Sequence, residues 1–124
     1  MNKLEIKHNK LTADEFIYLW ESVWDGTPTR EQVELALMNS IFAVSLYDEG
    51  KVVAMARMIG DMGLCYYIKD VVVHPDYQQQ GIGRLLINEL LSFIKANGIS
   101  GTEIFVELCA VPDKIPFYEK FGFS

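Results

Sequence analysis

A short glycine-containing segment between two apolar stretches constrains this chain more than any other feature. Gly81 and Gly83 follow the hydrophobic run 66–73, and an apolar helical pattern begins at Leu85. Glycine lets an anion approach the backbone closely, and the first N–H groups of a helix have no helical acceptor and lie at the positive end of its dipole. The sequence therefore predicts a strand, a turn and a helix start that together bind a phosphate group.

The spacing of these glycines argues against two common phosphate-binding motifs. A dinucleotide fingerprint has a third glycine three residues after the second, where this chain has Leu86. A Walker P-loop needs two glycines five residues apart, followed by Lys and then Ser or Thr, whereas Gly83 precedes Arg84. A nucleotide-binding protein of either kind is therefore disfavoured.

Length and charge narrow the class of protein. The chain has 124 residues, about half of them hydrophobic, and we expect a single domain over residues 1–124. A net charge of −6 argues against a nucleic-acid partner. No apolar stretch approaches the ~20 residues that span a bilayer, so we expect a cytoplasmic protein without membrane contact. Cys65 and Cys109 each stand alone, so we expect small core residues and no metal site.

Hydrophobic periodicity and turn residues predict nine elements. Thr12 with Glu15, and Thr29 with Gln32, have the spacing of capping boxes at two helix starts. The resulting order is β, α, α, β, β, β, α, β, α, which predicts an α/β fold with a mixed sheet and helices packed on it. We expect strands over 4–8, 41–47, 51–59, 64–73 and 102–109, and helices over 13–23, 30–39, 84–97 and 113–122.

Two motifs resemble one family. Gln78-x-x-Gly81-x-Gly83, after a strand ending at Val73, resembles the acyl-CoA pyrophosphate loop of the GNAT superfamily of N-acetyltransferases. The segment 117–123 resembles the late signature of that family, and the element order is similar nearly end to end. The resemblance implies a GNAT-like fold with a mostly antiparallel sheet. It also implies an enzyme that transfers acetyl from acetyl-CoA to a primary amine of a small molecule or peptide.

The resemblance also implies a cofactor site. Backbone amides from Gln80 to Arg84 would hold the pyrophosphate, although Arg84 itself could equally lie in solvent. The backbones of Val71 and Val73 would pair with the pantetheine arm as with an extra strand, while the valine side chains belong to the core. The full predicted set is Val71, Val72, Val73, Gln78, Gln79, Gln80, Gly81, Ile82, Gly83, Arg84 and Phe117.

Acyl transfer to an amine needs a proton for the departing thiolate and a route for the amine proton. Tyr118 resembles the family tyrosine near the cofactor sulfur, where a phenol can donate a proton, although it could also be an ordinary packed aromatic residue. Glu107 is our choice of base. Asp70, His74 and Glu103 are alternatives, and water could also carry the proton away.

Substrate selection in this family falls largely to the early helices and the loop between them. Trp24 could form the wall of an acceptor pocket, and Asp25 could attract an ammonium group. Packing of Trp24 over the hydrophobic core is an equally good interpretation.

The chain departs from the family at its end, because relatives usually carry one further strand after the Gly-Phe pair, here Gly122-Phe123. Either the sequence is trimmed or the sheet ends in an unpaired edge, and such an edge tends to recruit another chain, so a homodimer is allowed by the sequence. The departure also leaves room for an alternative function, a noncatalytic acyl-CoA-binding or sensing module on the same fold.

Overall fold

The structure, a computed structural model, describes residues 4–99 and 101–108. Within these ranges the element order agrees with the predicted order as far as the fifth strand, and the helix predicted over 113–122 lies outside them. None of the described helices is long and apolar enough to cross a membrane. The elements are β1 (Leu4–His8), α1 (Ala13–Val23), α2 (Arg30–Met38), β2 (Phe42–Asp48), β3 (Lys51–Gly60), β4 (Cys65–Val73), the 3-10 turn η1 (Pro75–Tyr77), α3 (Ile82–Asn97) and β5 (Phe105–Leu108).

Capping boxes begin both early helices, as the sequence predicts. The Glu15 N–H donates to the Thr12 hydroxyl at 3.1 Å, and the Thr12 N–H donates to the Glu15 carboxylate at 3.0 Å. Thr29 and Gln32 form the same reciprocal pair. Since each box satisfies N–H groups that have no partner within the helix, α1 and α2 begin directly after their cap residues.

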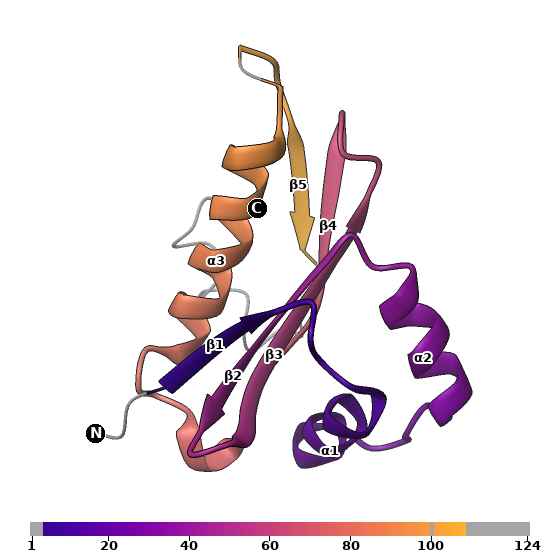
Figure 1. The fold of residues 1–124 in the computed structure, drawn as a ribbon, viewed down its shortest axis with the longest axis vertical. Helices are drawn as coiled ribbons and strands as arrows, with labels where there is room; N and C mark the ends of the chain where they lie inside the picture. The colour runs from indigo at the N-terminus through magenta and orange to yellow at the C-terminus, as the bar shows by residue number, and fades with distance from the viewer. Residues whose placement is uncertain (1–3, 100, 109–124) are drawn as a thin grey trace.

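The five described strands form one sheet in the order β1-β2-β3-β4-β5 (Figure 1). The first three pairings are antiparallel and the β4–β5 pairing is parallel, which confirms the predicted mixed, mostly antiparallel sheet. A tight turn cannot join parallel neighbours, so α3 makes the crossover between them. Figure 1 shows α3 on one side of the sheet and α1 and α2 on the other.

Each face of the sheet carries its own hydrophobic core. One core lies between the sheet and α3, and the other lies between the sheet and the pair α1 and α2. The α3 core includes Tyr66, Ile68, Leu86, Ile87 and Leu90, and the opposite core includes Phe16, Leu19, Val33, Met55 and Val72.

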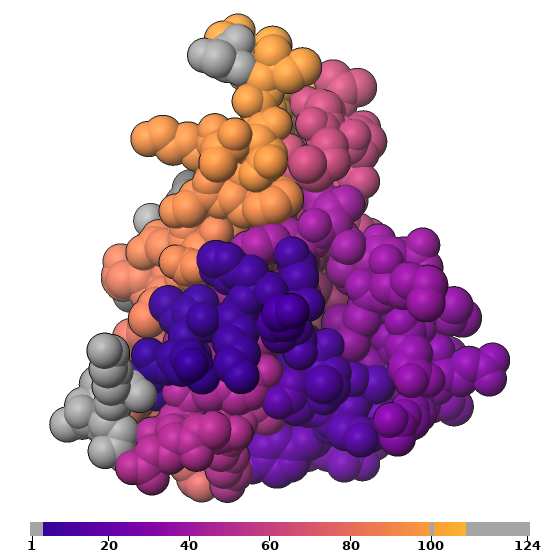
Figure 2. Space-filling model, in the orientation of Figure 1, coloured from indigo at the N-terminus to yellow at the C-terminus, as the bar shows by residue number. Residues whose placement is uncertain are grey.

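β1 is an edge strand, and Figure 2 shows it in indigo on the surface of the molecule. The His8 imidazole contacts the Glu89 carboxylate at 2.7 Å, which connects this strand to α3. The His8 ring also packs on Phe42, with ring centroids 5.0 Å apart. β1 is therefore joined to the rest of the fold by side chains as well as by its pairing with β2.

Candidate functional site

The glycine-containing segment lies between the end of β4 and the start of α3. Gly81 is the N-cap of α3 and has φ +81°, a left-handed conformation that glycine adopts without strain. Gly81 has no side chain with which to cap this helix, and the first turn of α3 holds no acidic residue. The first intrahelical bond runs from the Leu85 N–H to the Gly81 C=O at 3.2 Å, so the Ile82 and Gly83 N–H groups have no acceptor within the helix. Such a helix start suits an anion.

The three glutamines before Gly81 are exposed, and two of their side chains bond to the preceding backbone. The Gln78 side-chain amide donates to the Val73 C=O at 3.1 Å, and that of Gln80 donates to the Asp76 C=O at 3.4 Å. Gln79 adopts a left-handed conformation with φ +64°. These side chains therefore stabilise the turn that leads into the helix. Arg84 follows them, exposed, in the first turn of α3.

A β-bulge interrupts β4 just before this turn. Met55 and Arg57 of β3 pair with Val72 and Lys69 of β4, so two residues of β4 lie opposite one residue of β3. Asp70, within the bulge, has φ +54°. The sequence predicts a regular strand here, and the bulge corrects that expectation.

Upstream of the bulge, β4 pairs with β5. The Leu64 C=O accepts a hydrogen bond from the Phe105 N–H at 2.8 Å. Because peptide groups alternate in direction along a strand, those of Tyr66 and Ile68 also point toward β5. This parallel register continues to Ile68, which lies opposite Leu108, the last described residue of β5. The described part of β5 therefore ends before the level of the bulge.

Downstream of the bulge the alternation is reversed. The His74 N–H donates to the Val53 C=O of β3 at 2.9 Å, so the peptide groups of Val71 and Val73 point away from β3. The Gln78 contact to the Val73 C=O lies on that outer edge. An extended ligand could pair with the peptide groups of this edge, which is the arrangement that the predicted contact with a pantetheine arm requires.

The three valines differ in their surroundings. The side chains of Val71 and Val73 are half-buried against the α3 core. Val72 is buried in the opposite core, and it lies opposite Met55 in the pairing with β3. Val71 and Val73 therefore combine a core side chain with an outward-facing backbone, whereas the Val72 peptide faces β3.

Glu107, the predicted base, has an exposed side chain and lies opposite Tyr67 in the parallel register. Val106 and Leu108 on either side of it pack against the α3 core, so Glu107 points to the other face of the sheet. Glu103, an alternative base, is exposed and precedes β5.

Asp70, another alternative base, is held in a partly buried ion pair. Its carboxylate accepts a hydrogen bond from the Arg57 Nε at 2.5 Å, and the two side chains are only 12% and 15% exposed. The Arg57 Nη1 also donates to the Ser40 hydroxyl at 3.3 Å. The sequence pattern does not predict this pair.

His74 has a structural role at the end of β4. Its Nδ1 accepts a hydrogen bond from the Asp76 N–H at 3.1 Å, which caps η1. Its ring stacks on Tyr18 of α1, with ring centroids 5.7 Å apart. These contacts fix the imidazole between α1 and the turn that precedes the glycines.

The two residues predicted to contact the acceptor lie at the end of α1. Trp24 is half-buried, packs on the α1–α2 core and meets Trp20 edge to face, with ring centroids 4.6 Å apart. Its position agrees with the interpretation of a side chain packed over the core. Asp25 is exposed. The Trp20 Nε1 donates to the Gly26 C=O at 2.9 Å and so fixes the start of the loop.

Several sequence predictions fall outside the described residues or need correction. Phe117 and Tyr118, in the late motif, and Cys109 lie outside the described ranges. Cys65 does not belong to the core, because it is exposed at the start of β4 and points away from the α3 core, which buries its neighbour Tyr66.

One contact that sequence reasoning missed joins the turn to the β2–β3 hairpin. The Tyr77 hydroxyl donates to the Asp48 carboxylate at 2.6 Å. This hydrogen bond, together with burial, raises the pKa of the Tyr77 phenol above its usual value. The two residues are 29 positions apart, so no local pattern indicates the contact.

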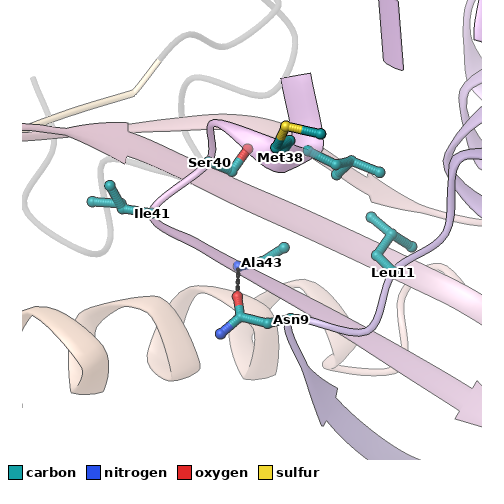
Figure 3. Close-up of a pocket in the computed structure, with 7 residues that line it drawn as sticks. Asn9, Leu11, Met38, Ser40, Ile41 and Ala43 are labelled. Atoms are coloured by element: carbon teal, nitrogen blue, oxygen red, sulfur yellow. Dashed lines mark hydrogen bonds between the residues drawn. The ribbon is translucent and has the colours of Figure 1, made fainter. Parts of the chain in front are cut away.

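A pocket of about 310 Å³ opens elsewhere, between the end of α2 and the start of β2 (Figure 3). Asp48, at the other end of β2, contacts the turn before the glycines. Seven strand residues span roughly 20 Å, so the pocket lies far from the glycine segment. Its lining comprises Asn9, Leu11, Leu37, Met38, Ser40, Ile41 and Ala43.

Known proteins resemble the chain over nearly its whole length. The family model described as the acetyltransferase (GNAT) family matches residues 8–123. An uncharacterized N-acetyltransferase, ycf52, from Pyropia yezoensis is 35% identical, over 98% of this chain and 74% of the relative. The GCN5-related N-acetyltransferase 2, chloroplastic, of Arabidopsis thaliana is 32% identical over 80% of this chain and 45% of the relative.

A solved structure shows the same arrangement. A probable acetyltransferase of unknown function from meticillin-resistant Staphylococcus aureus superposes with a TM-score of 0.90 at 30% identity. The superposition covers 98% of this chain and 90% of that one. With its sheet order, its glycine-containing helix start and these matches, the chain belongs to the GNAT family of acetyltransferases.

Proposed function

We propose that this chain transfers acetyl from acetyl-CoA to a primary amine of a small molecule or peptide, by direct attack of the amine in a ternary complex. One observation carries the proposal: the start of α3, which Gly81 leaves without a side-chain cap, follows the outward-facing peptide groups of Val71 and Val73 after one short turn. Among the described residues no strand pairs with β4 beyond Ile68 on this edge, and an anion site after such an edge suits a ligand with a pyrophosphate and an extended amide-containing arm.

The donor side of the proposed site uses backbone groups. Amides from Gln80 to Arg84 hold the pyrophosphate, and the absence of acidic side chains in the first turn of α3 supports that role. The peptide groups of Val71 and Val73 pair with the pantetheine arm, and Phe117 completes the set by resemblance. Gln78 shapes the turn through its bond to the Val73 C=O.

The chemical step moves two protons. The amine nitrogen attacks the thioester carbonyl, a C–N bond forms and the C–S bond breaks. We assign the amine proton to the Glu107 carboxylate and the proton that the departing thiolate receives to the Tyr118 phenol. Glu107 lies on the face opposite α3, close to the level at which the described β5 ends.

The acceptor approaches, in this proposal, from the face that carries α1 and α2. Asp25 is exposed and can attract an ammonium group, while Trp24 shapes the adjoining surface from its position on the core. For the setting we retain the predictions of a cytoplasmic protein, no nucleic-acid or membrane partner, and a chain capable of forming a homodimer.

Thiol release from acetyl-CoA, measured with a panel of primary amines, tests the proposal. We expect coenzyme A to bind and thiol to appear only with a suitable amine. Coenzyme A binding without amine-dependent release from any member of a broad panel would favour the noncatalytic module. Failure to bind coenzyme A would reject both functions.

Two variants test the proton assignments. Tyr118→Phe should lower turnover much more than cofactor affinity, and unchanged turnover across the pH range would remove Tyr118 as the acid. Glu107→Gln should alter the acidic limb of the pH profile of acetylation, because an amide cannot accept the proton. An unaltered limb would reject Glu107 as the base.

A further inference from the structure

Asp70 is unusual because its backbone is left-handed in the middle of a strand. Its φ of +54° is disfavoured for residues other than glycine, although aspartate tolerates it better than most. A residue in such a conformation persists where its surroundings hold it. The regular ladder with β3 is interrupted after Lys69 and resumes only at Val72, so the ladder itself does not pair Asp70.

Arg57 of β3 provides that contact. Its Nε donates to the Asp70 carboxylate at 2.5 Å, and its Nη1 donates to the Ser40 hydroxyl at 3.3 Å. Ser40 in turn donates to the Ala36 C=O in α2 at 2.7 Å. The guanidinium is therefore fixed at two points, between the end of α2 and the bulge of β4.

Burial distinguishes this ion pair from the surface pairs of the molecule. The side chains of Arg57 and Asp70 are 15% and 12% exposed, whereas Arg30 and Asp14, which lie 3.3 Å apart, are 63% and 71% exposed. Water and salt screen an exposed pair, so it contributes little. Removing one partner of a buried pair leaves the other charge poorly solvated, which is far more costly. Loss of either partner would therefore disturb the bulge far more than loss of a partner in a surface pair.

We propose that Arg57 is a positioning residue for the acyl-CoA arm. Through the Asp70 carboxylate it keeps the extra residue of β4 in the bulge, and the bulge turns the peptide groups of Val71 and Val73 away from β3. Without the bulge, those two peptide groups would point toward β3 and the outer edge would lose its present pattern. This inference rests on the proposed function, since it names the residue that shapes the donor site.

The proposal differs in its consequences from a role of Asp70 as the base. A positioning pair controls the affinity for coenzyme A, whereas a base controls turnover when acyl-CoA is saturating. Asp70→Asn retains an oxygen that accepts from the Arg57 Nε, so we expect it to weaken affinity less than Asp70→Ala. Retained affinity with a large loss of kcat in Asp70→Asn would assign proton transfer to Asp70 and overturn the positioning role.

The experiment compares Arg57→Met and Arg57→Lys with Arg30→Met, which removes an exposed arginine from a surface Arg–Asp pair. Coenzyme A affinity is measured by calorimetry, and amide hydrogen exchange is measured over residues 69–74. We expect Arg57→Met to weaken affinity about 10- to 100-fold and to speed exchange over 69–74. Arg57→Lys should retain more of the coenzyme A affinity and exchange more slowly over 69–74 than Arg57→Met does. Arg30→Met should change neither the affinity nor the exchange.

The two measurements separate the possible failures. Arg57→Met with wild-type affinity and exchange would overturn the inference. If the wild-type chain does not bind coenzyme A, the proposed function fails, and the inferred role of Arg57 in the acyl-CoA site fails with it. If Arg57→Met does not fold, the comparison of Arg57→Lys with the wild type decides, and equal affinity and exchange in those two would also overturn the inference.

Discussion

Substitution of Gly81 by alanine should affect coenzyme A affinity at the proposed anion site more than it affects the stability of the fold. Apart from its two chain neighbours, no described residue has a heavy atom within 4 Å of a Cβ added at Gly81, so the cost comes from the left-handed backbone and not from a clash. That backbone costs an L residue about 1–2 kcal/mol, and a less flexible unfolded chain returns about 0.4–1 kcal/mol. We expect a net loss of roughly 1 kcal/mol, or a fall in Tm of about 4 °C for a domain of this size.

The expected effect on binding is larger. A backbone that relaxes away from the left-handed conformation turns at least one N–H at the start of α3 away from the ligand. One hydrogen bond to a charged group contributes about 1.5–3 kcal/mol, which corresponds to a roughly 10- to 150-fold loss of affinity for coenzyme A. Titration calorimetry with coenzyme A, alongside thermal unfolding, measures both quantities on the same sample.

Gly101→Ala is the matched control. Gly101 also has φ +81° and open space around its Cβ position, but it lies beyond the other end of α3. The 16 residues of that helix make it about 24 Å long, so the two glycines lie beyond its opposite ends. Gly101→Ala should lower Tm by a similar amount and leave affinity unchanged. Equal coenzyme A affinities for the wild type and Gly81→Ala would refute the reasoning. Equal losses of affinity in Gly81→Ala and Gly101→Ala would refute it too.

Two further predictions concern stability. Tyr77→Phe removes the 2.6 Å hydrogen bond to Asp48 and should lower the urea midpoint at neutral pH. The pKa of Tyr77 is higher in the folded state than in the unfolded state, so the stability that this phenol contributes is complete below about pH 10 and is lost as the pH rises further. Tyr77→Phe should lack this alkaline loss of stability. Identical alkaline stability profiles for the wild type and the variant would contradict the prediction. Leu86→Ala, at a fully buried position, should cost about 2–5 kcal/mol in urea unfolding. Leu35→Ala, at an exposed one, should change stability by less than about 0.5 kcal/mol, and similar costs would contradict the assigned core.

Elements whose ends are marked by local chemistry were predictable from the sequence. Thr12 and Thr29 place two helix starts, and Pro75 ends β4 within two residues. The start of α3 differs from the prediction, at Ile82 instead of Arg84, because left-handed Gly81 acts as the cap without a side chain. The proposed donor site also rests on a local motif, Gln78-x-x-Gly81-x-Gly83, whose residues are close together in the sequence.

Features set by distant residues were not predictable. The bulge in β4 depends on how β3 pairs with it, and no glycine or proline marks its position. Asp70 adopts the left-handed conformation there beside Arg57, which is 13 positions away. The exposure of Cys65 likewise depends on which distant side chains pack over the start of β4, and periodicity along one strand carries no information about that packing.

The contact between the Gln78 side chain and the Val73 C=O changes what an arriving ligand gains. When an acyl arm pairs with β4 as proposed, its N–H replaces a hydrogen bond that the protein already makes. Exchange of one neutral hydrogen bond for another is nearly balanced in free energy. The Val73 carbonyl would then align the ligand along the strand and add little to its affinity. A ligand that lacks a correctly spaced N–H would leave the hydrogen bond from Gln78 to the Val73 C=O intact.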